Sequence, residues 1–209
     1  MPGNGFALLV MIFCLMTVGS VQAEGRVDPA YKLIQSMAEQ AKSRLSNDTL
    51  PIDRRESLFR QDIRPAFDFD FISAFVVGPK WDRLEPRQKE EFTDLFSEFF
   101  LQSYSFQFGG YPEDRFEILE VKANGDGDLF VLTQLFRPNR KRVVSRWRLR
   151  ESADGLRIVD VEISGTSVIT AHRKSFHNQL VRGSVEGLLN ILRMRAERLS
   201  PQSTGSGEG

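Results

Sequence analysis

Cysteine is almost absent from the 209-residue sequence, which has a single copy at Cys14. One cysteine forms no disulfide within the chain and builds no cysteine-ligated zinc site. Histidine occurs only at His172 and His177, five positions apart, whereas two ligands on one helix need a spacing of three or four. We therefore expect no metal site and no disulfide framework, so a packed apolar core must hold the fold.

An excess of charge of one sign is also missing, because 28 Lys and Arg balance 28 Asp and Glu. A neutral chain gives no support to nucleic-acid binding by bulk charge. The sequence contains no Gly-x-Ser-x-Gly, no P-loop and no dinucleotide fingerprint. Residues 124–128 resemble the start of a calcium loop, but Leu129 and Leu135 stand where Gly and Glu are needed. We expect a hairpin turn there, no catalytic residue and no enzymatic activity.

Phenylalanine is what the sequence has in excess, with 17 copies against 3 tyrosines. Rings without hydroxyl groups make an interior that is dry and has few polar atoms. Two interpretations remain open. The rings form an ordinary aromatic core, or some of them line an apolar cavity.

The N-terminal segment has the pattern of a signal peptide. Residues 6–18 are apolar and uncharged but too few to span a membrane, and Val21 and Ala23 suit signal peptidase. We expect residues 1–23 to be removed, 24–199 to form one domain, and the Ser/Gly-rich residues 200–209 to be a disordered tail.

Helix signals divide the first half of the chain. Asp28 suits the N-cap of a first helix, a second is expected over 51–64, and Asp70 suits the cap of a third. The strongest pattern starts at Pro86, where a broad apolar stripe opposes a charged face. The stripe comprises Phe92, Leu95, Phe96, Phe99, Phe100 and Tyr104. It packs against a sheet, or one edge of it touches a ligand.

Four strands follow, separated by short turns that force antiparallel pairing. They are expected at 116–121, 129–136, 143–150 and 156–163. Helices, a meander and two further helices make an α+β fold. We expect a four-stranded antiparallel curved sheet, covered by helices that enclose an apolar cavity.

Alternation assigns the faces of the last two strands. Arg146, Arg148 and Arg150 share one face of the third strand; we favour a solvated surface, with a docking patch for an acidic partner or lipid headgroups as the alternative. On the fourth strand, Val159 and Val161 face away from Asp160. A corner at Gly165 then brings the next helix back, so we expect an ion pair between Asp160 and Arg173.

Two motifs carry a family resemblance. One reads D-V-x-x-x-G-x-S over 160–167, followed by Arg173, Phe176 and Gly187-Leu188-Leu189; the other starts at Val77-Gly78-Pro79-Lys80-Trp81 and continues with Leu84, Gln88, Phe92, Phe96 and Tyr104. Together they resemble the MlaC-type family of toluene-tolerance auxiliary proteins, over nearly the whole chain after residue 28. Leu156 departs from the pattern, which has an aromatic residue before the first motif.

The resemblance implies a periplasmic, monomeric lipid carrier with the fold of an NTF2-like cone. It implies phospholipid as cargo, no other cofactor, and partners in an inner-membrane ABC/MCE transport complex and an outer-membrane lipoprotein complex that maintain outer-membrane lipid asymmetry. Burying a methylene contributes about 0.8 kcal/mol, so some thirty methylenes resist crossing water by over ~20 kcal/mol. A hopanoid or other hydrophobic cargo, a small NTF2-like enzyme, and a protein-binding chaperone or adaptor are the alternatives.

The expected cavity wall combines the helix stripe, the inward strand face and the short third helix. No catalytic or metal-binding residue is assigned. The expected lipid-binding residues are Phe71, Phe75, Val76, Phe92, Phe96, Phe99, Phe100, Val143, Trp147, Val159 and Val161.

Overall fold

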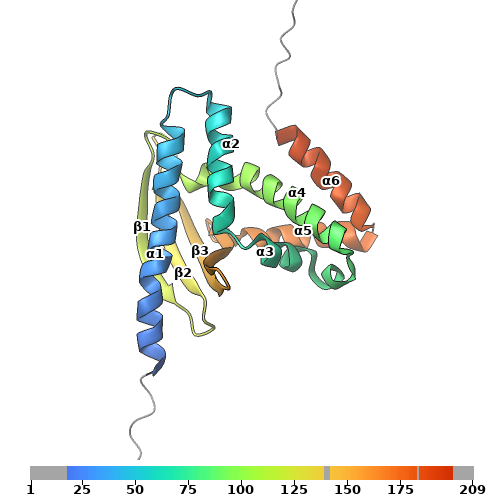
Figure 1. Cartoon of the computed structure of the whole chain (residues 1–209), viewed down its shortest axis with the longest axis horizontal. Helices are drawn as coiled ribbons and strands as arrows, with labels where there is room; N and C mark the ends of the chain where they lie inside the picture. The colour runs from blue at the N-terminus through green and yellow to red at the C-terminus, as the bar shows by residue number, and fades with distance from the viewer. Residues whose placement is uncertain (1–17, 139–141, 183, 200–209) are drawn as a thin grey trace, which may run out of the picture.

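The computed structural model describes residues 18–138, 142–182 and 184–199 (Figure 1). Its α-helices are α1 (Val18–Leu45), α2 (Ile52–Ile63), α3 (Phe69–Val77), α4 (Pro86–Tyr104), α5 (Val168–Arg182) and α6 (Val185–Leu199). Short 3₁₀ helices are η1 (Arg64–Ala66), η2 (Gly78–Arg83) and η3 (Ser105–Phe108). The strands are β1 (Arg115–Ala123), β2 (Leu129–Phe136), β3 (Val143–Ser152), β4 (Gly155–Ile163) and β5 (Thr166–Ser167).

The sheet is an antiparallel meander in the order β1-β2-β3-β4-β5. Its first four strands lie within two residues of the predicted bounds, because alternating apolar residues and short turns mark them clearly. The hairpin predicted at 124–128 is confirmed: the Asn124 amide donates to the Asp128 carbonyl at 2.9 Å, and Gly127 donates back to Asn124 at 3.0 Å.

The prediction of four strands is wrong, because the corner after β4 is a two-residue hairpin that adds a fifth. Ser164 and Gly165 both have positive φ, at 50° and 85°, which is the backbone twist that two-residue hairpins need. Ser167 therefore pairs with Glu162 as β5. Two residues are too few to show alternation, so the sequence pattern could not mark this strand. The structure shows an open sheet with helices, and it does not confirm a cone.

The predicted alternation on β4 fails at one position, where a β-bulge interrupts the pairing with β3. Leu149 lies opposite Ile158 and Arg148 lies opposite Asp160, so Val159 has no partner on β3. The core cluster consequently contains Ile158 and Val161, while Val159 is buried outside that cluster. A bulge adds one residue to a strand without a mark in the period-two pattern.

The helices pack into one core with the apolar face of the sheet. α1 lies along the sheet beside α2, whereas α3, α4, α5 and α6 form a group at its far side (Figure 1). Two predicted caps are wrong. α1 starts at Val18 and contains Pro29 within it, and the side chain that caps α3 is Asp68, which accepts from the Phe71 amide at 2.9 Å.

The predicted signal peptide lies only partly within the described residues, and the predicted tail lies outside them. Positions 1–17 and 200–209 lie outside them, and the expected cleavage after Ala23 falls inside α1. Cleavage and the domain limits of 24–199 stay predictions. Among the described helices, none combines the length and apolarity that crossing a membrane requires.

Candidate functional site

A continuous set of touching rings fills the space between α4, α5 and the sheet. Neighbouring ring centroids lie 4.8–6.4 Å apart, mostly edge-to-face or tilted, the arrangements that aromatic quadrupoles favour. We call this set the aromatic cluster: Phe67, Phe69, Trp81, Phe92, Phe96, Phe99, Phe100, Tyr104, Phe108, Trp147, His172 and Phe176.

Five of the eleven expected lipid-binding residues belong to the aromatic cluster: Phe92, Phe96, Phe99, Phe100 and Trp147. All of these except Phe99 are 0% exposed, so in this structure they pack against one another and not around an open space. None of the eleven lines any of the three described pockets. A lipid chain that touched these rings would have to separate them, and their contact with lipid stays a prediction.

The expected residues of α3 lie elsewhere. Phe71 and Phe75 are half-buried and stack on each other at 6.4 Å, apart from the aromatic cluster. The Arg150 guanidinium lies 4.7 Å from the Phe71 ring centre, and that of Arg173 lies 4.7 Å from Phe75. Two cation–π contacts thus cover the pair of rings that was expected to form part of the cavity wall.

The remaining four expected residues differ in burial and position. Val76 and Val161 are core residues, and Val161 lies opposite Trp147 in the sheet register. Val143 is half-buried at the start of β3, and Val159 occupies the bulge. The structure thus brings the α4 rings, Trp147 and Val161 together, and it leaves Val143, Val159, Phe71 and Phe75 outside the aromatic cluster.

One polar pair lies inside the aromatic cluster. Tyr104 Oη and His172 Nε2 are 3.0 Å apart, and the His172 ring touches those of Phe96 and Phe99. Burial, and secondarily the positive charge of Arg195, lower the pKa of His172 to about 4. The imidazole is therefore neutral near pH 7, so the polar pair inside the aromatic cluster carries no charge there, and the Arg195 guanidinium lies at the edge of the cluster, 5.4 Å from the Phe99 ring centre.

The arginines of β3 are paired, so the predicted basic face is largely neutralised. Arg148 Nε and Arg150 Nε donate to the Asp128 carboxylate at 2.6 and 2.8 Å, and that side chain is only 1% exposed. Hydrogen bonds from Arg150 and then Arg148 hold the pKa of Asp128 below its usual value. Arg146 pairs with Glu162. The sequence could not show this, because Asp128 reaches the strand only through the hairpin fold.

The predicted ion pair between Asp160 and Arg173 is wrong. Asp160 accepts from Ser167 Oγ at 2.7 Å and from the Ile169 amide at 3.4 Å, and so caps the start of α5. Arg173 instead donates to the Phe75 carbonyl at 2.7 Å and joins α5 to α3. The corner at Gly165 is tighter than the prediction assumed, so the carboxylate meets the first turn of α5 and not its second.

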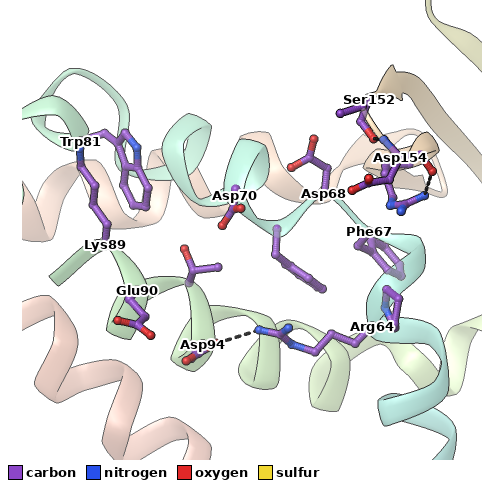
Figure 2. A pocket seen from close by; sticks show the side chains of 15 residues that line it. Arg64, Phe67, Asp68, Asp70, Trp81, Lys89, Glu90, Asp94, Ser152 and Asp154 are labelled. Atoms are coloured by element: carbon purple, nitrogen blue, oxygen red, sulfur yellow. Dashed lines mark hydrogen bonds and ion pairs between the residues drawn. The ribbon is translucent and has the colours of Figure 1, made fainter. Parts of the chain in front are cut away.

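An open cleft of about 740 Å³ lies beside the aromatic cluster, between α3 and α4 (Figure 2). We call it the α3–α4 cleft. Its lining comes from η1, α3, η2, α4 and the β3–β4 hairpin: Arg64, Pro65, Phe67, Asp68, Phe69, Asp70, Trp81, Lys89, Glu90, Thr93, Asp94, Ser152, Ala153, Asp154 and Arg157.

Three cleft residues also belong to the aromatic cluster. Phe67 and Phe69 contact Phe100 at 5.6 and 5.7 Å, and Trp81 contacts Phe92 at 6.2 Å. The wall of the α3–α4 cleft is therefore the outer layer of the apolar interior. A molecule with a polar end and apolar chains would find both environments in contact here.

The cleft residues of α4 were missed because their helix face was interpreted as solvent-facing. Lys89, Glu90, Thr93 and Asp94 lie on one side of α4, and that side faces α3 across the cleft. The alternation of Phe67, Asp68, Phe69 and Asp70 was the available signal, since it places rings and carboxylates side by side at the start of α3. Nothing in the sequence indicated that these two segments face each other.

The chemistry that this arrangement supports is binding. Within the described ranges no group of three or more metal-ligating side chains occurs. The buried His172 contacts the Tyr104 hydroxyl and the rings of Phe96, Phe99 and Phe176. The site thus offers an apolar interior, an aromatic wall and a polar opening.

Comparison with known proteins identifies a family and a solved structure that the chain resembles. The family model described as MlaC protein matches residues 35–194. The solved structure of a phospholipid-binding protein from Ralstonia solanacearum, in complex with a phospholipid, superposes with a TM-score of 0.69. That structure is 20% identical in sequence, and the alignment covers 84% of this chain and 99% of the other. No curated protein matches the chain.

Proposed function

We propose, from the premise that this chain belongs to the MlaC family, that it binds phospholipid and carries it between membranes. The acyl chains would enter the aromatic cluster, and the headgroup would stay in the α3–α4 cleft. The chain would act as a carrier without catalysing a reaction. In this proposal it works in the periplasm as a monomer, between an inner-membrane ABC/MCE complex and an outer-membrane lipoprotein complex.

The observation that carries the proposal is the shared wall. Phe67 and Phe69 face the cleft on one side and touch Phe100 of the aromatic cluster on the other. Displacing these rings would connect the polar opening to a dry, uncharged interior. Each methylene that leaves water there contributes about 0.8 kcal/mol, so two chains supply enough free energy to compensate for repacking several rings.

The solved structure from Ralstonia solanacearum also supports the proposal. Its fold is shared, and it is described as phospholipid-binding and contains a phospholipid. A bound lipid within the same fold is consistent with a core that opens between helices and sheet. Transfer between membrane complexes rests on family membership.

Lipid uptake tests the proposal. Full-length protein from a phospholipid-containing host is examined by native mass spectrometry, and bound lipids are extracted and identified. We expect phospholipid at a fixed stoichiometry, and radiolabelled phospholipid should move from donor to acceptor vesicles faster with the protein present. A hopanoid or another apolar compound as the sole cargo would support the alternative carrier. Protein that carries no lipid and takes none up would overturn the proposal.

Two variants test whether the acyl chains bind in the aromatic cluster. Phe99 is half-buried in the aromatic cluster, whereas Phe106 is 43% exposed and does not belong to it. Phe99→Glu should abolish lipid uptake while Phe106→Glu retains it, because only the first puts a carboxylate among chain methylenes. Circular dichroism checks that both variants fold. Equal uptake by the two folded variants would exclude the aromatic cluster as the chain site.

A further inference from the structure

The charges of the α3–α4 cleft are unequal. Its cations are Arg64, Lys89 and Arg157, and its carboxylates are Asp68, Asp70, Glu90, Asp94 and Asp154. Carboxylates outnumber cations although the whole chain is neutral. The cleft is thus a locally negative opening on a molecule without net charge.

Some of these charged side chains already have partners within the protein. Arg64 donates to Asp94 at 2.8 Å, and Asp68 caps α3. Of the described residues, none forms an ion pair with Lys89, Asp70 or Glu90. The cleft is therefore lined, among the described residues, by two cations and three carboxylates without an ion-pair partner: Lys89 on α4 and Arg157 on the β3–β4 hairpin, and Asp70, Glu90 and Asp154.

Aromatic rings hold the cations at the cleft wall. The Lys89 ammonium lies 5.7 Å from the Trp81 ring centre, and the Arg64 guanidinium lies 5.8 Å from that of Phe69. Figure 2 shows Asp70 in the gap between α3 and α4, with Lys89 toward one end and Arg64 toward the other. A ligand in the gap would meet positive charge at the aromatic wall and negative charge beside it.

We propose that the α3–α4 cleft selects zwitterionic phospholipid headgroups and rejects anionic ones. This inference rests on the proposed function. A phosphate pairs with Lys89 at the aromatic wall, while the ammonium of the same headgroup pairs with Asp70 and Glu90. A glycerol headgroup has no ammonium, so its phosphate adds a negative charge to an already negative cleft.

Competition within one membrane tests this selectivity. The protein is stripped of lipid and incubated with sucrose-loaded vesicles of palmitoyl-oleoyl phosphatidylethanolamine and phosphatidylglycerol in equal amounts. The vesicles are removed by sedimentation, and bound lipids are counted by mass spectrometry. Identical chains and a common vesicle surface leave the headgroup as the only difference. We expect an ethanolamine-to-glycerol ratio of about five, which falls toward one in high salt as charges are screened.

Two double variants with equal charge change locate the effect. Asp70→Asn with Glu90→Gln removes two carboxylates from the cleft, and the ratio should fall to about one. Asp48→Asn with Asp53→Asn removes two exposed carboxylates at the other end of α2, and the ratio should be unchanged.

The outcomes separate the two proposals. Uptake of neither lipid would overturn the proposed function. Uptake of both in the vesicle ratio, a preference for phosphatidylglycerol, or the same loss of selectivity in both double variants would leave lipid carriage intact and overturn the headgroup inference.

Discussion

The aromatic cluster and the α3–α4 cleft share a wall but differ in charge and in exposure to water. In the aromatic cluster, the one titratable pair is neutral and the rings exclude water. On the cleft side of Phe67 and Phe69, the half-buried Asp68 caps α3 and the exposed Asp70 has no ion-pair partner among the described residues. The contrast teaches that one short segment, 67–70, separates two environments, each suited to one half of an amphiphile.

The largest expected loss of stability comes from putting a charge into the aromatic cluster. Phe96→Glu loses the contacts of a fully buried ring with five aromatic neighbours and buries an unpaired carboxylate. We expect a destabilisation above ~5 kcal/mol, enough to unfold the chain. Circular dichroism and urea titration measure it. Phe96→Leu, which stays apolar, should remain folded; a folded Glu variant of normal stability would mean that the interior is wet.

A smaller loss is expected at the shared wall. Phe69 is 5% exposed and contacts Phe67, Phe100 and the Arg64 guanidinium. Phe69→Ala should lower the free energy of unfolding by about 3 kcal/mol and should also widen the connection between the two regions. Chemical denaturation gives the first effect and the rate of lipid exchange with vesicles the second. Destabilisation without faster exchange would contradict a role as a barrier.

The protonation of His172, which is buried in the aromatic cluster, should make the stability of the fold depend on pH. The pKa of His172 is about 4 in the folded state and about 6.5 when unfolded, so the unfolded chain binds more protons between these values. The free energy of unfolding should therefore fall as pH falls from about 6.5 to 4, by up to about 3 kcal/mol. Urea titrations across this range measure the slope. His172→Gln should remove it and the exposed His177→Gln should retain it; equal slopes in both variants would assign the effect to other groups.

The smallest effect is expected in the cleft. Asp94 and Arg64 form an ion pair whose side chains are 68% and 45% exposed, and such pairs contribute little. Asp94→Asn should cost less than ~1 kcal/mol by urea titration, and a loss above ~2 kcal/mol would show that the cleft is structural. We thus expect the aromatic cluster to determine the stability of the fold and the α3–α4 cleft to determine which headgroup binds.

Local patterns predicted the strands well and the site poorly. The bounds of β2 and the Asn124–Asp128 hairpin follow from alternation and turn residues within a few positions. The pairing of Asp128 with Arg148, the capping by Asp160 and the bulge at Val159 depend on register and corner geometry, which short-range patterns do not carry.

The α4 stripe shows the same limit at the site. Its burial was correctly assigned from the period of the helix, because Phe92, Phe96 and Phe100 recur every four residues. The charged side of α4 has the same sequence signature whether it faces solvent or a second helix. Only the position of α3, set by contacts far along the chain, turned that side into the wall of a cleft.

The bridge between Phe67 and Ile158 constrains the order in which the molecule assembles. The meander forms from neighbouring strands, whereas this bridge, together with the hydrogen bond from the Asp68 amide to the Ile158 carbonyl, joins segments far apart in the sequence. Non-local contacts of this kind lose loop entropy before they gain energy, so they form late. We expect the folding nucleus to contain the β2–β3–β4 meander, and the α3–α4 cleft to appear only after β4 is complete. The opening of the site then takes its shape only after the sheet that supports it has formed.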